Sequence, residues 1–244
     1  MSTRKRPNVQ PVVPSDHTRN QVRTHHNAIA RVGRSKRDAI RWYDRLSPWY
    51  GSTVARLDER PRNRGVELLD LQPGERVHEI GSGPGTALVQ FAEEVGQTGH
   101  VTGLDISSGM CGVARETVRE AGVESRVSIV RGDAEHLPFE AGAFDAIFTS
   151  FTLELFDSPA LPAVLGECRR VLGEDGRLGV VALSKRDAGL TTRAYERVHE
   201  LLPKYADCRP IFARELLDES KFDVETAETW PLWGLAAEVV IARS

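Results

Sequence analysis

The sequence predicts an α/β fold with a mostly parallel sheet, and two observations support that prediction. Short stretches rich in Val and Ile alternate with amphipathic stretches of helical period through the middle of the chain. At the end, the stretches 221–232 and 233–244 both have strand character, and no helix separates them. Parallel strands buried on both faces need covering helices, so we expect a helix-covered parallel sheet closed by an antiparallel pair.

The N-terminal part of the chain precedes this alternation. Residues 1–35 contain Pro, Asn, Ser and His without periodicity, which indicates a flexible basic tail. A helix is expected from about residue 35 to 45, running into the aromatic stretch WYDRLSPWYG, and a second helix over 58–71. We interpret residues 36–70 as a helical lid segment of one domain that spans 36–244.

The remaining elements follow in order along the chain. Strands are expected over 76–80, 100–106, 126–132, 144–150 and 176–184, and helices over 85–96, 108–122, 158–173 and 188–202. In the first of these helices, one face carries Leu88, Phe91, Ala92 and Val95. Ser107 is suited to cap the start of the second, because its hydroxyl can accept a hydrogen bond from a free backbone N–H.

The composition is that of an ordinary globular chain, with 40% apolar and 27% charged residues. No apolar run approaches the length of a membrane span, and the N-terminus lacks the apolar core of a secretory signal. Cys111, Cys168 and Cys208 are widely spaced, without a CxxC pair, so we expect reduced thiols and no metal site. These features predict a cytoplasmic protein.

Charge is distributed unevenly along the chain. Residues 1–41 hold ten Lys and Arg against two acids, a net charge of +8, and the rest of the chain has a net charge of −11. The basic tail could contact anionic lipid, so peripheral membrane contact is a further expectation. No aromatic residue lies among the basic residues before Trp42, so no nucleic-acid partner is expected.

The stretch VHEIGSGPGTALVQ, residues 77–90, joins an expected strand to an expected helix through three alternate glycines. The dinucleotide fingerprint G-x-G-x-x-G requires a glycine where Thr86 stands, and no lysine follows to make a phosphate loop. Pro84 removes one backbone donor from the turn. The loop therefore favours a ligand that carries an adenosine but no phosphate and lies against bare backbone.

Acidic residues stand at the ends of the next strands. Asp105 ends the second strand, where an acid can accept hydrogen bonds from the hydroxyls of a ribose. Asp133 follows the third strand and is suited to an adenine amino group. Because ligands of open α/β sheets bind outside the carboxyl ends of the strands, these acids and the glycine loop are expected to share one site.

These motifs resemble those of a known family. VHEIGSGPG, GLDIS, GDAEHLPF, FDAIFTSFTLELF and RVLGEDGRL, in this order over about residues 38–244, look like the class I methyltransferases that use S-adenosylmethionine. EHLPF and WYDRLSPWYG look most like the ubiquinone/menaquinone-biosynthesis C-methyltransferase group. The resemblance implies a Rossmann-like sheet of seven strands, the last of them antiparallel, with the methionine end of the cofactor over the glycine loop.

The resemblance and the strand ends together give a set of candidate site residues. Those expected to bind the cofactor are Glu79, Gly81, Ser82, Gly83, Gly85, Asp105, Ile106, Asp133, Ala134 and Ser150. Those expected to line the acceptor pocket are Tyr43, Tyr50, Phe151, Thr152 and Arg209. A ring-carbon acceptor needs its phenol deprotonated, and the candidates for that base are His136, Glu154, His199 and Tyr43.

The predicted function is S-adenosylmethionine-dependent methyl transfer to a small apolar or aromatic acceptor, such as a quinol or a lipid-like compound. Two alternatives stay open at this point. One is a phospholipid or other small-molecule N- or O-methyltransferase, and the other is a cofactor-binding regulator without transfer activity. A nicotinamide oxidoreductase is disfavoured by Thr86.

Overall fold

The computed structural model describes residues 32, 35–53, 59–186, 192, 195–197, 208–232 and 234–244, and for residues 49–53 it describes the backbone alone. The predicted tail therefore lies outside the described residues, apart from Val32 and Ser35, and so does most of the helix expected over 188–202. Within the described part, no helix is both long enough and apolar enough to cross a membrane.

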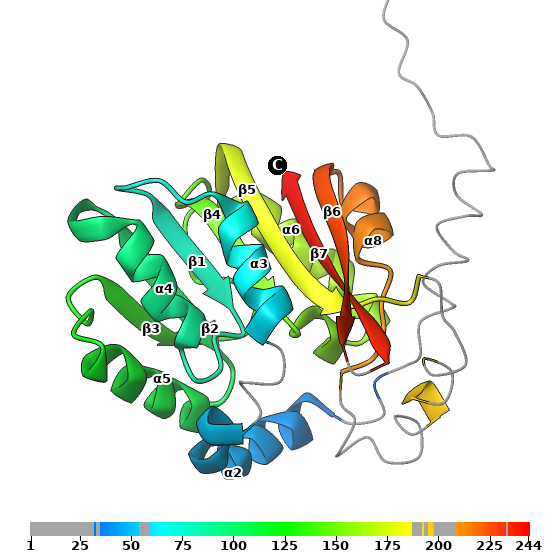
Figure 1. Ribbon diagram of the computed structural model, residues 1–244, viewed down its shortest axis with the longest axis horizontal. Helices are drawn as coiled ribbons and strands as arrows, with labels where there is room; N and C mark the ends of the chain where they lie inside the picture. The colour runs from blue at the N-terminus through cyan, green and yellow to red at the C-terminus, as the bar shows by residue number, and fades with distance from the viewer. Residues whose placement is uncertain are drawn as a thin grey trace, which may run out of the picture.

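A seven-stranded sheet forms the middle of the molecule (Figure 1). In chain order its strands are β1 (Arg76–Ile80), β2 (His100–Asp105), β3 (Val127–Arg131), β4 (Phe144–Ser150), β5 (Leu172–Leu183), β6 (Asp223–Leu232) and β7 (Leu235–Arg243). The spatial order is β3-β2-β1-β4-β5-β7-β6, and β7 is antiparallel to both of its neighbours while the other pairs are parallel. The predicted fold class and its closing antiparallel pair are confirmed.

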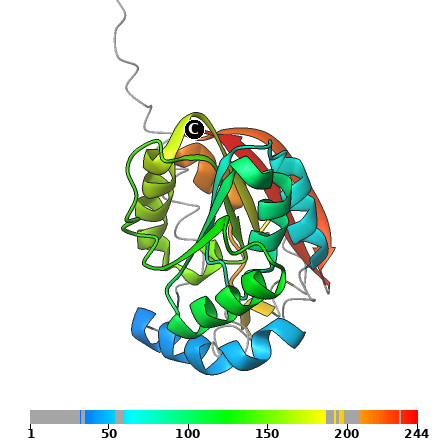
Figure 2. The same ribbon diagram turned by 90° about the vertical axis from the view of Figure 1, so that its left-hand side faces the viewer.

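Helices cover both faces of this sheet, as Figure 2 shows. They are α2 (Lys36–Thr53), α3 (Glu59–Leu69), α4 (Thr86–Glu94), α5 (Ser108–Glu120), α6 (Leu161–Val171) and α8 (Ala213–Glu219). On one face, α6 and α8 contribute Leu165 and Leu216 to a core cluster that also contains Ile147 of β4. On the other face, α3, α4 and α5 form a second core around Phe91 and Phe148. Strand order reverses between β1 and β4, and such a switch point is where open α/β sheets bind ligands.

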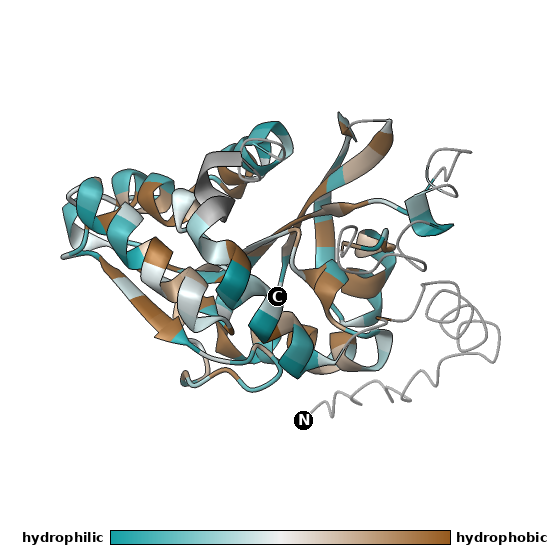
Figure 3. Ribbon diagram, turned by 90° about the horizontal axis from the view of Figure 1, so that it is seen from below, coloured by the Kyte–Doolittle hydropathy of each residue, from teal (hydrophilic) through white to brown (hydrophobic). Residues whose placement is uncertain are grey.

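The apolar pattern of the sequence accounts for most of these elements. The apolar face expected for α4 is buried, and the Ser107 hydroxyl caps α5 by accepting from the backbone N–H of Met110 at 3.1 Å. The helix α8 was not expected, because seven residues are too few for a helical period to be visible. Figure 3 shows the outcome, with apolar residues gathered on the strands and both colours on the surrounding helices.

The helix α2 lies at the carboxyl edge of the sheet and packs against the start of α5 (Figures 1 and 2). Asp44 Oδ1 accepts hydrogen bonds from Ser107 Oγ at 2.6 Å and from the backbone N–H of Gly109 at 2.9 Å. The bond from Ser107 lowers the pKa of Asp44, and a negative charge at a helix N-terminus is favourable. A Cβ at Gly109 would lie 2.5 Å from Ser47 Oγ, so glycine permits this close approach.

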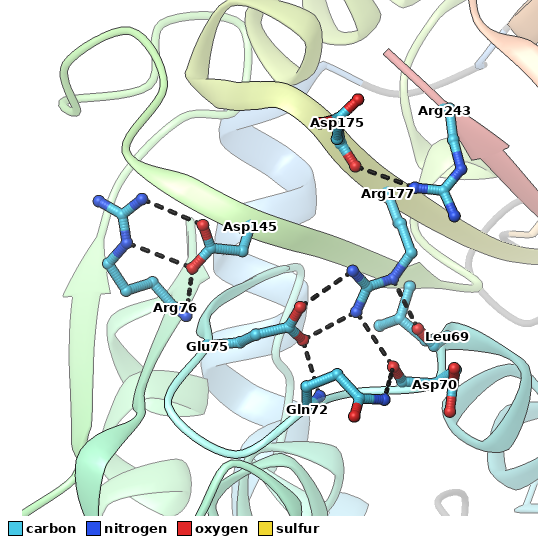
Figure 4. Close-up of polar contacts among 9 residues, drawn as sticks. All are labelled: Leu69, Asp70, Gln72, Glu75, Arg76, Asp145, Asp175, Arg177 and Arg243. Atoms are coloured by element: carbon cyan, nitrogen blue, oxygen red, sulfur yellow. Dashed lines mark hydrogen bonds and ion pairs between the residues drawn. The ribbon is translucent and has the colours of Figure 1, made fainter.

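The opposite edge of the sheet is held by an ion pair (Figure 4). Arg177 of β5 donates two hydrogen bonds to the Glu75 carboxylate, at 3.0 and 2.8 Å, and a third to the carbonyl oxygen of Leu69 at 2.8 Å. The two side chains are only 14% and 17% exposed. These hydrogen bonds therefore hold the end of α3 and the turn before β1 against strand β5.

A neutral histidine stands inside the core on β1. His78 is fully buried, its ring stacked on Phe144 at a centroid distance of 4.8 Å and edge-on to Phe139 at 4.9 Å. Its Nδ1 lies 2.8 Å from the carbonyl oxygen of Thr102, which fixes the proton on that nitrogen, and Nε2 has no hydrogen-bond partner among the described residues. Burial lowers the pKa of His78 to about 4.

Candidate active site

A cavity of about 380 Å³ opens at the carboxyl ends of β1, β2 and β4, with α2 on one side. This volume is within the usual range for small-molecule sites. The polar residues that line it are Lys36, Tyr43, Arg62, Glu79, Ser82, Thr86, Asp105, Asp133, Glu135, Ser150, Thr152 and Asp157. The other lining residues are Val32, Ala39, Ile80, Gly81, Gly83, Pro84, Ala87, Leu104, Ile106, Met110, Gly132, Ala134, Phe151, Leu155, Phe156 and Ala160.

The glycine loop turns from β1 into α4 along the floor of this cavity. The backbone N–H groups of Gly81 and Ser82 both donate to the carbonyl oxygen of Leu104, at 2.8 and 3.1 Å. Gly83 has a φ of 50°, and a Cβ added there would meet no described atom within 4 Å. This position therefore leaves an open cradle against which a ligand can lie.

Gly85 has a different role from the one predicted for it. It does not line the cavity, and a Cβ there would lie 3.0 Å from Cα and Cβ of Ala114 on α5. With a φ of 81°, it also stands at the start of α4 in the left-handed conformation. Its glycine character thus serves helix packing and the turn, whereas the other nine residues predicted to bind the cofactor line the cavity.

Asp105 holds the glycine loop in place. Its Oδ2 accepts from the backbone N–H of Gly83 at 3.0 Å, and its Oδ1 accepts from that of Ser107 at 2.8 Å. Burial raises the pKa of Asp105, and these two backbone bonds oppose the rise. Because a carboxylate oxygen can accept more than one hydrogen bond, both oxygens keep capacity for ligand hydroxyls.

Glu79 lies on β1 at the same end of the cavity and is only 3% exposed. Its Oε2 has no hydrogen-bond partner among the described residues. Burial raises the pKa of Glu79 well above its ordinary range, Arg62 opposes the rise, and Asp105 adds to it. A buried carboxyl with an unsatisfied oxygen is costly, which marks this spot as a place for a polar or cationic ligand group.

Arg62 is a lining residue that sequence reasoning missed. It comes from α3, is 8% exposed, and belongs to the buried face that also contains Gly65, Val66 and Leu69. An arginine at a core-facing helical position was the available signal, because such a residue is almost never buried without a partner or a ligand. It supplies a positive charge opposite the acids of β1 and β2.

Lys36 is a second residue that sequence reasoning missed. Its Nζ lies 2.6 Å from Asp133 Oδ2 and 2.6 Å from Glu135 Oε1, so α2 is tied to the loop that follows β3. Asp133 also accepts from the backbone N–H of Glu135 at 3.1 Å. Lys36 and Asp133 are 97 positions apart in the sequence, so no local pattern predicts their contact.

The residues after β4 form another wall. Ser150, Phe151 and Thr152 all line the cavity, and Thr152 Oγ1 donates to the carbonyl oxygen of Ser150 at 3.0 Å. Phe151 has a φ of 49°, a conformation that is uncommon for a bulky residue. Its backbone N–H donates to the carbonyl oxygen of Val181 at 2.8 Å, and its own carbonyl oxygen accepts from Cys208 Sγ at 3.7 Å. Tyr43 of α2 lines the cavity as well.

Several predicted acceptor-side residues lie elsewhere. Glu154 is fully buried outside the cavity wall, and its Oε1 accepts from the backbone N–H of Leu183 at 2.7 Å. Arg209 is also fully buried, where it donates to Ser158 Oγ at 3.2 Å and to the carbonyl oxygen of Phe156. Both therefore support the loops behind the wall.

Three further residues were predicted for the acceptor side: His136, His199 and Tyr50. His136 is exposed and does not line the cavity. His199 and the side chain of Tyr50 lie outside the described residues. No group of three or more His, Cys, Asp or Glu in the described ranges could hold a metal ion.

Comparison with known proteins identifies the central part of the chain. Residues 77–176 match the family model of a methyltransferase domain. The chain is 35% identical over 125 residues to the ubiquinone/menaquinone biosynthesis C-methyltransferase UbiE of Rhizobium johnstonii, covering 51% of this chain and 48% of that protein. It is 36% identical over 138 residues to the nocamycin O-methyltransferase of Saccharothrix syringae, covering 57% and 48%. The chain thus spans about half the length of these curated relatives.

Solved structures share the fold over a larger part of the chain. The [4+2]-cyclase SpnF superposes with a TM-score of 0.68 and 19% identity, covering 84% of this chain and 95% of that one. The 1,6-didemethyltoxoflavin-N1-methyltransferase of Burkholderia thailandensis superposes with a TM-score of 0.64 and 19% identity, covering 88% and 94%. The chain therefore shares its fold with these structures, carries a match to a methyltransferase domain over residues 77–176, and is similar in sequence to ubiquinone/menaquinone biosynthesis C-methyltransferases.

Proposed function

We propose that this chain transfers a methyl group from S-adenosylmethionine to a small apolar or aromatic acceptor, a quinol or a lipid-like ring compound. The observation that carries the proposal is the buried Glu79 carboxyl, which faces the cavity with one oxygen unbonded among the described residues. Asp105 lies beside it and the open cradle of Gly83 adjoins it. This donor and acceptor set suits an amino acid joined to a nucleoside.

Each end of the cofactor has suitable partners in the cavity. The Glu79 carboxylate attracts the ammonium group, and Arg62 attracts the carboxylate of the methionine part. Asp105 receives the ribose hydroxyls, and Asp133 receives the adenine amino group. Ile106 and Ala134 offer apolar contacts to the adenine ring, and the backbone at Gly81 and Gly83 borders the methionine chain.

The role of the protein in the reaction is to position the acceptor and exclude water. The cofactor supplies an activated methyl carbon on a sulfonium, so little covalent chemistry is left to the chain. The residues after β4 and the inner side of α2 hold the acceptor next to that carbon. Fixing the two reactants in this way makes a bimolecular step effectively unimolecular. Phe151, Leu155 and Phe156 make this part of the cavity apolar.

The acceptor must lose a proton if a ring carbon or a hydroxyl is methylated. Among the described base candidates, Tyr43 is the one that lines the cavity, and its phenol can exchange a hydrogen bond with an acceptor hydroxyl. Asp157 lines the same cavity and was not a candidate from the sequence. The nocamycin relative is named an O-methyltransferase. An oxygen atom is therefore a candidate for methylation as well as a ring carbon.

Calorimetric titration with S-adenosylmethionine, followed by transfer of a labelled methyl group to quinol, phenol and lipid fractions, tests the proposal. We expect Glu79→Gln to weaken cofactor binding by about tenfold or more, because it removes a charged hydrogen-bond acceptor. Glu75→Gln is the matched control, because Glu75 belongs to the ion pair at the opposite edge. Cofactor binding without transfer to any fraction would instead support a regulator.

A further inference from the structure

The outward side of α2 carries a stripe of positive charge. Arg37, Arg41 and Arg45 stand four residues apart and are all exposed. Residues at that spacing share one side of a helix and succeed each other by about 6 Å along its axis. Pro48, which follows in the same helix, is also exposed. The stripe is thus a narrow, cationic surface on the helix that borders the cavity.

Other described side chains of α2 contact the protein, which fixes the direction of this stripe. Lys36, Ala39 and Tyr43 line the cavity, and Asp44 and Ser47 adjoin the start of α5. The inward side of the helix is therefore used by the fold. The arginines are left on the outside, at the carboxyl edge of the sheet where the cavity opens.

Few acids compensate the stripe. Asp38 pairs with Arg41 at 3.1 Å, and Asp44 points instead to the start of α5. The two acids of the loop after β3 are already bridged by Lys36. Arg131, exposed at the end of β3, adds a further positive charge that acts on Asp44. The outward side of α2 therefore carries three positive charges against one acid, Asp38.

The charge of α2 itself also favours a negative surface. Residues 36–48 of the helix hold four basic residues against two acids, a net charge of +2. A surface of positive charge is attracted to a negative one.

We propose that the arginine stripe of α2 docks the carboxyl edge of the sheet onto an anionic lipid bilayer. Guanidinium groups form paired hydrogen bonds with phosphate, and cationic side chains near a membrane are attracted to acidic headgroups. An apolar acceptor dissolved in that bilayer would then lie beside the entrance of the cavity. This inference concerns a surface and does not require that methyl transfer take place.

Vesicle co-sedimentation of the full chain tests the docking directly. One set of vesicles contains phosphatidylcholine alone, and the other also contains phosphatidylglycerol. We expect binding to the anionic vesicles only, with loss at high salt, because ions screen exposed charges. The variant with Arg37→Gln, Arg41→Gln and Arg45→Gln should bind the anionic vesicles at least about tenfold more weakly, since each of these charges contributes near the surface.

The matched control removes the same number of charges from the opposite edge. Arg119 and Arg169 lie in the last turns of α5 and α6, and Arg243 ends β7, so all three are far from α2. Their replacement by Gln should leave vesicle binding within about twofold. Calorimetric titration with S-adenosylmethionine shows whether each variant keeps its folded cavity, and thereby separates docking from the proposed function.

Three results would overturn the inference. The first is equal binding to both kinds of vesicle, and the second is an equal loss in the two triple variants. The third is retention of duplex DNA through the α2 arginines without binding to anionic vesicles, which would assign the stripe to nucleic acid.

Discussion

The pH dependence of stability should be governed in part by His78, the buried neutral histidine of β1. Burial lowers its pKa to about 4 from the ordinary histidine value of 6.5. As pH falls through the unfolded value, the unfolded chain takes up a proton that the folded chain refuses, so the folded state loses stability. The loss begins near the unfolded pKa and is complete below the folded one.

The size of the effect follows from the two pKa values. The linkage relation gives a loss of about 2 kcal/mol between pH 7 and pH 5, and about 3 kcal/mol in full below pH 4. The carboxyls of Glu79, Asp105 and Glu238 have pKa values raised by burial, which favours the folded state at low pH and acts in the opposite direction. A comparison with a non-titrating variant removes these shared contributions.

Urea unfolding of the native chain and of His78→Leu, measured at several pH values, isolates the histidine. The variant has its own stability at neutral pH, because it loses the hydrogen bond to Thr102 and changes the packing on Phe144. The informative quantity is how the free energy of unfolding changes with pH. Between pH 7 and pH 5 the native chain should lose about 2 kcal/mol more than the variant does. Parallel curves would refute the assignment of a buried, neutral His78.

Three further outcomes are expected. Asp105→Ala should weaken S-adenosylmethionine binding by about 1.5–3 kcal/mol in calorimetry, the range for hydrogen bonds to a charged group, and an unchanged affinity would assign the ribose to another residue. Gly83→Val should fold by circular dichroism yet fail to bind the cofactor, because its side chain enters the cradle and its φ is disfavoured; normal binding would contradict the cradle. Arg177→Leu should lower the free energy of unfolding by about 2–4 kcal/mol, because Glu75 loses its partner, while cofactor affinity stays constant.

Local patterns account for much of the fold that could be predicted. The sequence FDAIFTS predicts β4 with its observed bounds, and the cap at Ser107 follows from one hydroxyl before an amphipathic run. The antiparallel closing pair was visible because two strands without an intervening helix leave no room for a parallel crossover. The short helix α8 was not predicted, because only three of its seven side chains are buried and so few apolar positions show no helical period.

The cavity shows where sequence reasoning stops. Acids that follow parallel strands reach the same edge by topology alone, so Asp105 and Asp133 could be assigned to one site from the sequence. Arg62 and Lys36 reach the cavity from helices that precede the sheet in the chain, and their positions depend on how those helices pack. Arg209 shows the converse case, since a polar side chain near an expected pocket instead supports backbone atoms within the core.

The contact at Gly109 joins α2, which borders the cavity, to α5, which packs on the sheet. It therefore limits which substitutions the two helices can accept. At this position an added Cβ would lie 2.5 Å from Ser47 Oγ and 3.0 Å from Asp44 Cα, so a methyl group requires the serine side chain and the backbone of α2 to shift. The residues at positions 44, 47 and 109 therefore constrain one another, although they belong to two different helices. A substitution at position 109 would thus displace part of the helix that borders the cavity while the glycine loop keeps its sequence.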